Sequence, residues 1–145
     1  MTNTIAATFG VIYFLTGVSG FVMTPHGGIF LGIFAVNWFH HLFHIVLGIL
    51  GPVSAWQNKG YLYCQVSGAV LILLGILGFI VPGAAVVLLA IPPADLFTDN
   101  LLHLTTGVAL LYFGFVSRAA LGYAGKQEGS PVEQSEPSTQ KRNIS

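Results

Sequence analysis

The residues of this sequence that could do chemistry are histidines and one aspartate at helical spacing. His40 and His44 are four residues apart in an apolar segment, and Asp99 and His103 repeat that spacing farther along the chain. Residues i and i+4 lie on one face of a helix, so each pair would point in one direction. Imidazole and carboxylate are the usual protein ligands of zinc, copper and iron. The two pairs therefore predict a metal site if their helices face each other.

Three polar neighbours allow a structural interpretation of the same residues. Asn37, His41 and Asn100 flank the two pairs, and asparagine and aspartate are favourable helix N-caps. In this interpretation the capping residues and the histidines form a hydrogen-bond network that links two helices. Two histidines on facing helices could also ligate a haem from both sides. The sequence leaves open a structural network, a divalent transition metal and a haem.

The composition determines which elements must position these residues. Only 7% of the 145 residues are charged and 54% are hydrophobic, whereas soluble domains carry about 25% charged residues. The chain is therefore expected in a membrane. Its net charge is zero, which disfavours a nucleic-acid interface. A single cysteine excludes an intramolecular disulfide and a cysteine-based zinc motif.

Four apolar segments are long enough to span a bilayer, which needs about 20 residues. They cover residues 5–23, 38–57, 61–82 and 99–122. Shorter apolar stretches at 29–36 and 84–91 are expected at the membrane interface or, for the first, as a lead into the next helix. We predict an all-α, membrane-spanning four-helix bundle in residues 1–123. Residues 124–145 are polar and rich in Ser, Gln and Glu and are expected to form a disordered cytoplasmic tail.

The helices repeat in pairs. The sequence around Gly10 and Gly17 recurs 58 residues later around Gly68 and Gly75, and the spacing of His44 and Gly48 recurs 59 residues later. This pattern predicts a tandem duplication of one helical hairpin, related by an axis along the membrane normal. Small residues two helical turns apart predict close helix packing. The glycines in these positions are Gly10, Gly17, Gly48, Gly68, Gly75, Gly107 and Gly114.

The basic residues predict the orientation. With four spans, Lys59, Arg118 and Lys126 lie on the same side as both termini, and basic residues favour the cytoplasmic side. We therefore expect both termini in the cytoplasm, in a bacterial inner membrane or a thylakoid membrane. The histidines would then lie toward the outer face.

The stretches from Val36 to His44 and from Asp99 to Leu104 resemble the paired motifs of a family of small bacterial membrane proteins, known only as a domain of unknown function. The first motif of that family is Asn-x-x-His-Asn-x-x-His, which Asn37, His40 and His44 match. His41 stands where the family usually has asparagine. The resemblance covers about residues 5–122 and implies four spanning helices and a bacterial origin, with cyanobacteria among the candidate sources, but no reaction.

Two functions follow as expectations. The first is a non-enzymatic accessory or assembly subunit that contacts lipid and a larger membrane complex or a second copy of itself. The alternative is a protein that binds a metal or haem through His40, His44, Asp99 and His103 near the outer face. The polar residues at one end do not form a transport pathway, and no nucleophile–base motif predicts an enzyme.

Overall fold

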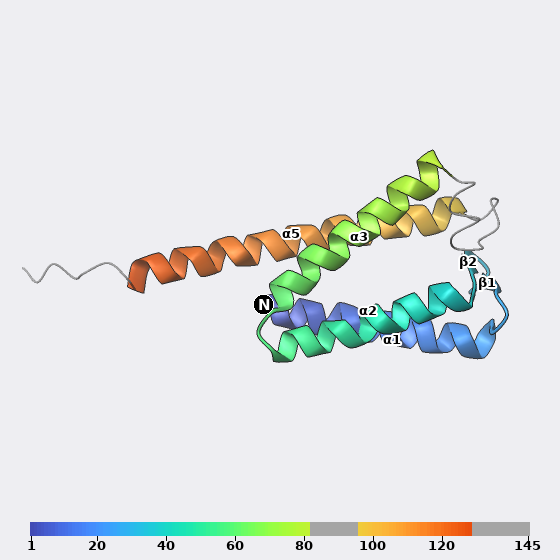
Figure 1. Cartoon of the computed structure of the whole chain (residues 1–145), viewed down its shortest axis with the longest axis horizontal. Helices are drawn as coiled ribbons and strands as arrows, with labels where there is room; N and C mark the ends of the chain where they lie inside the picture. The colour runs from blue at the N-terminus through green and yellow to red at the C-terminus, as the bar shows by residue number, and fades with distance from the viewer. Residues whose placement is uncertain (82–95, 129–145) are drawn as a thin grey trace, which may run out of the picture.

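The computed structural model describes residues 1–81 and 96–128, and this part of the chain folds into four helices and one short β-hairpin. Figure 1 shows two helical hairpins, one made of α1 and α2 and the other of α3 and α5. The predicted all-α, four-helix fold is confirmed. The elements are α1 (Thr2–Met23), β1 (Gly28–Phe30), β2 (Phe34–Val36), α2 (Trp38–Trp56), α3 (Gly60–Ile80) and α5 (Leu96–Glu128).

Three helices, α1, α2 and α3, are long and apolar enough to cross a membrane. Large hydrophobic side chains are exposed along all four helices, which a protein in water would tend to avoid. These surfaces indicate contact with a lipid bilayer. The helix α5 extends past Tyr123 to Glu128. The expected connector at 84–91 and residues 129–145 of the expected tail lie outside the described residues.

Glycines allow α1 and α2 to touch along their backbones. A Cβ atom on Gly17 would lie 2.7 Å from the backbone oxygen of His41, and one on Gly10 would lie 2.9 Å from the backbone oxygen of Gly48. A Cβ on Gly48 would lie 2.5 Å from the Cα of Phe14. These separations leave no room for a side chain. Close backbone packing of this kind drives helix association where lipid supplies no hydrophobic force.

The second hairpin repeats these contacts. A Cβ on Gly75 would lie 2.9 Å from the backbone oxygen of Asn100, and one on Gly68 would lie 2.7 Å from that of Gly107. A Cβ on Gly114 would lie 2.8 Å from Cγ and 3.0 Å from the backbone nitrogen of Gln65. The contacting positions correspond to those of the first hairpin at the offsets seen in the sequence. The duplication itself stays a prediction, because similar packing does not establish a common origin.

Residues 28–36 form a β-hairpin, and the sequence-based expectation of an interfacial segment or helix lead-in did not include a strand. Its strands pair antiparallel, with Phe30 opposite Phe34. Leu31 and Gly32 have positive φ angles of 53° and 77°, and the Ile33 N–H donates to the Phe30 carbonyl at 3.3 Å. The loop is therefore a short turn with a left-handed backbone, of the kind that closes β-hairpins. The segment is apolar on both faces, which hid its two-residue period.

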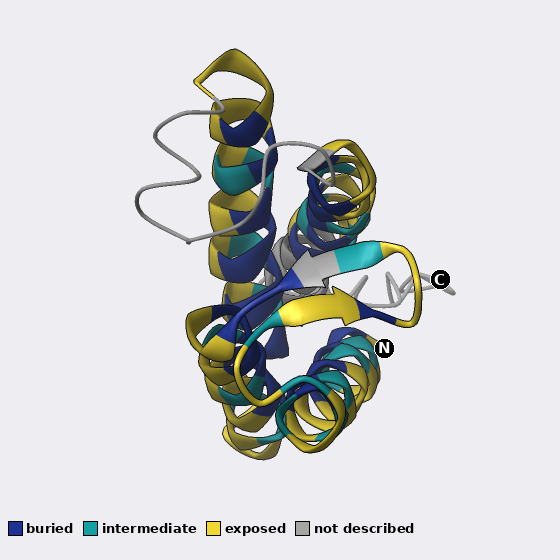
Figure 2. Cartoon of the chain, turned by 90° about the vertical axis from the view of Figure 1, so that its right-hand side faces the viewer, coloured by how far each residue is buried: buried dark blue, intermediate teal, exposed yellow. Residues whose placement is uncertain are grey.

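The two helical hairpins meet in a small core of mostly apolar residues and are also joined at one end. The buried cluster consists of Ala6, Tyr13, Leu47, Tyr63, Cys64, Leu71 and Leu110. The Asn3 side chain donates to Asn58 Oδ1 at 2.8 Å and accepts from the Gly60 N–H at 3.1 Å. These bonds link the start of α1 to the turn between α2 and α3. At the other end, the β-hairpin crosses between α1 and α5 (Figure 2).

Substitution of Gly107 tests the packing. We expect Gly107→Leu to lower the free energy of unfolding in detergent by about 1–3 kcal/mol, the usual cost of overpacking, because its Cβ would lie 2.9 Å from the Gly68 oxygen. The neighbouring Val108 is exposed, so Val108→Leu serves as the control and should change stability by less than about 0.5 kcal/mol. Equal effects in a denaturant titration would contradict the proposed contact.

Candidate functional site

Three histidines from two helices converge in the interior. His40 and His44 come from α2 and His103 comes from α5, and all three side chains are buried. One ligating nitrogen from each lies within 4.8 Å of the other two. The His40 ring is 4.4 Å from the His44 ring and 5.8 Å from the His103 ring, measured between centroids. We call these three residues the histidine triad.

Asn37 determines where α2 begins and so places the triad's first member. Its side-chain oxygen accepts a hydrogen bond from the His40 N–H at 2.8 Å, which is the standard N-cap contact. His40 therefore lies in the first turn of the helix, and His44 follows one turn later on the same face. Gly48 continues that face and packs against α1. The glycine contact thus turns both imidazoles toward the interior.

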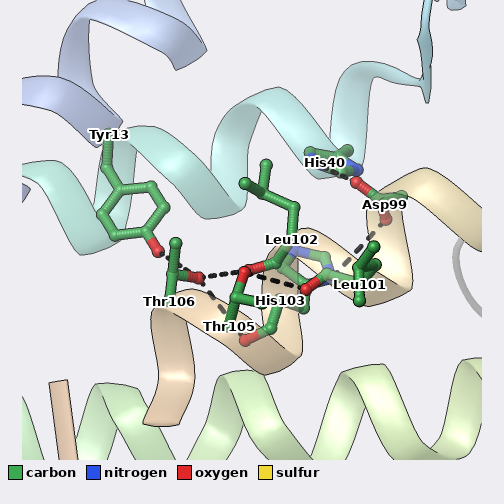
Figure 3. A network of polar contacts seen from close by, with 8 residues as sticks. All are labelled: Tyr13, His40, Asp99, Leu101, Leu102, His103, Thr105 and Thr106. Atoms are coloured by element: carbon green, nitrogen blue, oxygen red, sulfur yellow. Dashed lines mark hydrogen bonds and ion pairs between the residues drawn. The ribbon is translucent and has the colours of Figure 1, made fainter. Parts of the chain in front are cut away.

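Asp99 lies between two members of the triad. One carboxylate oxygen is 3.8 Å from His40 Nε2, and the other is 3.5 Å from His103 Nδ1 (Figure 3). The carboxyl group is buried in the first turn of α5. A negative charge is favourable at a helix N-terminus, where backbone N–H groups are unpaired. Asp99 is also positioned to orient the His103 ring, as carboxylates do for metal-bound histidines.

His44 has an unsatisfied polar atom. Its Nε2 is buried and has no hydrogen-bond partner among the described residues. A buried polar group without a partner costs about 1–3 kcal/mol. Its ring packs 5.2 Å from the Tyr13 ring, measured between centroids, at a tilt of 54°. The atom therefore lacks the partner that a purely structural network would provide.

His41 points away from the triad and makes a different set of contacts. Its Nε2 lies 3.1 Å from Thr24 Oγ1 and 3.2 Å from the Thr24 carbonyl oxygen, and its ring fills the space beside Gly20. The bonds join the end of α1 to the start of α2. His41 thus has the structural environment that the triad lacks.

Asn100 occupies the corresponding place in the second hairpin. It packs against Gly78 as His41 packs against Gly20. Its buried Nδ2 has no partner among the described residues. Asn100 and His41 therefore fill equivalent positions between helices, outside the histidine triad.

Tyr13 borders the site and was not singled out from the sequence. Its hydroxyl donates to Thr106 Oγ1 at 3.4 Å across the two hairpins (Figure 3). Thr106 in turn donates to the Leu102 carbonyl at 2.6 Å. The sequence feature that could have identified Tyr13 is its position between Gly10 and Gly17, on the packing face of α1. A polar group on that face must point into the protein.

The geometry fits a single ion better than a haem. The ligating atoms of a tetrahedral zinc site with Zn–N bonds of about 2.0–2.1 Å lie about 3.3–3.4 Å apart, so small rotations of the rings would close the triad around an ion. A haem held by two of these nitrogens would lie in the plane between them. The third nitrogen, within 4.8 Å of both, would then overlap the macrocycle.

A family described as a domain of unknown function, DUF4383, matches residues 3–116. Comparison with curated proteins and with solved structures finds no match.

Substitution of two of the buried histidines, His44 and His41, distinguishes a ligand site from a structural network. In metal-free protein, we expect His44→Leu to raise the free energy of unfolding by about 1 kcal/mol, because it removes an unsatisfied buried nitrogen. His41→Leu should lower it by a similar amount, because it breaks the contact with Thr24. Denaturation in detergent with a chelator measures both. Equal losses in the two variants would favour the structural network.

Proposed function

Since the chain belongs to the DUF4383 family, a domain of unknown function, we propose its function from the site alone: it is an integral membrane protein that binds one divalent transition-metal ion between α2 and α5. His40, His44 and His103 are the ligands. The observation that carries the proposal is the unpartnered Nε2 of His44 within this triad. An ion would satisfy that atom and the other two histidines together.

The donor set indicates the class of metal. Neutral imidazole suits zinc, copper, iron and nickel, whereas magnesium and calcium prefer oxygen ligands. Three histidine nitrogens leave a fourth position open in a tetrahedral zinc site. Asp99 adds a negative charge 3.8 Å from His40 and 3.5 Å from His103. That charge offsets the positive ends of α2 and α5, which would otherwise oppose a cation.

An accessory or assembly role is the second candidate. It is supported by an apolar groove of about 510 Å³ between α2 and α3, where the two helical hairpins diverge. A helix of another membrane protein could bury these side chains. Recovery of the chain alone in a pull-down from native membranes would argue against this role. The groove is lined mainly by Phe43, Val46, Leu50, Val53, Leu62, Val66 and Val70.

The proposed orientation places both termini in the cytoplasm and the histidine triad near the outer face of a bacterial membrane. Lys59 in the turn between α2 and α3 supports it. The triad residues lie near the starts of α2 and α5. Figure 1 shows both starts at the end of the molecule opposite that turn, near the β-hairpin. A reporter enzyme fused to the C-terminus should be active in the cytoplasm, and activity on the outer side would reverse the assignment.

Metal uptake tests the main proposal. Protein stripped with a chelator should take up one equivalent of Zn²⁺ or Co²⁺, and Co²⁺ should give the strong visible bands of a four-coordinate site. Free ion at 100 times Kd should stabilise the fold by about 2.7 kcal/mol. His44→Ala and His103→Ala should abolish uptake. His41→Ala is the control and should retain it, because His41 lies outside the triad.

Two results would contradict this function. One is purified wild-type protein that neither contains metal by elemental analysis nor changes its melting temperature when ions are added. The other is a Soret band in protein taken from its native membrane, which would identify a haem in place of a single ion.

A further inference from the structure

A cavity adjoins two members of the histidine triad, His40 and His44. Its volume is about 510 Å³, within the range of small-molecule pockets. It extends from His40, His44 and Asp99 toward α1 and the β-hairpin. Its other walls are formed mainly by Leu15, Ser19, Met23, Phe30, Phe34 and Leu102.

The wall along α1 offers no free hydroxyl hydrogen. Thr16 donates its hydroxyl to the Ile12 carbonyl at 2.8 Å, and Ser19 donates to the Thr16 carbonyl at 3.1 Å. Both bonds stay within the helix. Thr16 and Ser19 therefore contribute little polarity, and the strongly polar part of the cavity is formed by His40, His41, His44 and Asp99. A ligand that fills it must be apolar along its length and polar at one end.

The cavity opens toward lipid. Leu15 and Leu102 line it from α1 and α5, yet 60% and 41% of their surfaces remain exposed. Figure 2 shows the β-hairpin crossing the end of the molecule between these two helices. Phe30 and Phe34 of that β-hairpin line the cavity. These apolar side chains disfavour entry of a hydrated solute past the β-hairpin, so the exposed surface at Leu15 and Leu102 is the route that remains.

The net charge of the proposed site with its metal ion bound determines which polar group the ligand should carry. A divalent ion with three neutral histidines and the Asp99 carboxylate carries a net charge of about +1. Charge buried in a medium of low dielectric constant is costly unless it is paired. An anionic oxygen at the open coordination position would neutralise it. A carboxylate meets this requirement, whereas a neutral quinone or alcohol does not.

We infer that the fourth ligand of the ion is the carboxylate of an amphiphile with one apolar chain, which enters from the membrane between α1 and α5. The chain occupies the apolar cavity, and the carboxylate oxygen binds the ion beside His40 and His44. This inference rests on the metal-binding function proposed above and adds the class of ligand to it.

Titration of the Co²⁺-loaded protein in a non-ionic detergent tests the inference. Acetate, hexanoate and decanoate should each shift the visible bands, since each places a carboxylate on the ion. The dissociation constant should fall about threefold to fourfold for every methylene that the cavity buries. Decanol, which has a chain and no charge, should leave the bands unchanged.

The repeat supplies a matched pair of variants. Leu15 lines the cavity, and Leu73 occupies the position 58 residues later on α3, outside the cavity, with a similar exposure of 56%. Leu15→Trp should bind Co²⁺ and acetate as the wild type does, but lose the gain in affinity with chain length. Leu73→Trp should keep that gain.

The outcomes separate the two proposals. Wild-type protein that binds Co²⁺ but shows no response to carboxylates, or no dependence on chain length, would overturn the ligand and leave the metal site intact. A response to a short-chain quinone with none to decanoate would overturn the choice of a carboxylate. Failure of the wild-type protein to bind Co²⁺ would remove both proposals.

Discussion

The direct contact between helix backbones at glycine positions is the constraint on which the rest of the structure depends. In a bilayer, apolar side chains gain nothing by leaving lipid for another helix, so the helices associate where their backbones can approach. Gly17 against His41, and Gly75 against Asn100, set the rotation of α2 and α5 about their axes. Once that rotation is fixed, His44 and His103 face the interior. The polar site is a consequence of the packing, and a larger residue on the glycine face would displace it.

Burial of polar groups is the second constraint, and the two ends of the molecule meet it differently. At one end, Asn3 bonds to Asn58 and to the N–H of Gly60, so the groups satisfy each other. At the other, His41 bonds to Thr24, but the triad holds His44 Nε2 without a partner. A network selected for stability alone would complete its hydrogen bonds. Tyr63 OH and Asn100 Nδ2 also lack partners among the described residues, but of these three atoms only His44 Nε2 belongs to a cluster of ligating side chains. The triad is therefore the place to look for a ligand.

The sequence predicted the helices and the faces that carry the polar residues, because both depend on local patterns. Length and hydropathy define the spans, and the i, i+4 rule places His40 with His44 and Asp99 with His103. The β-hairpin was missed because Gly28–Val36 is apolar on both faces, so its alternation was hidden. The contact from Tyr13 to Thr106 joins residues 93 positions apart. Such a contact depends on how the two hairpins meet, and no local pattern reports it.

The site is asymmetric although the helical hairpins resemble each other. At the repeat offset of 59, His44 corresponds to His103, whereas His40 corresponds to Asp99. One hairpin therefore supplies two imidazoles, and the other supplies one imidazole and a charge. The cavity borders His40 and His44 from one helical hairpin and Asp99 from the other, together with residues of α1 and the β-hairpin. Two identical copies would place equal side chains on both sides of a shared axis. In the proposed site, aspartate in place of a fourth histidine would give a bound ion a neutralising charge.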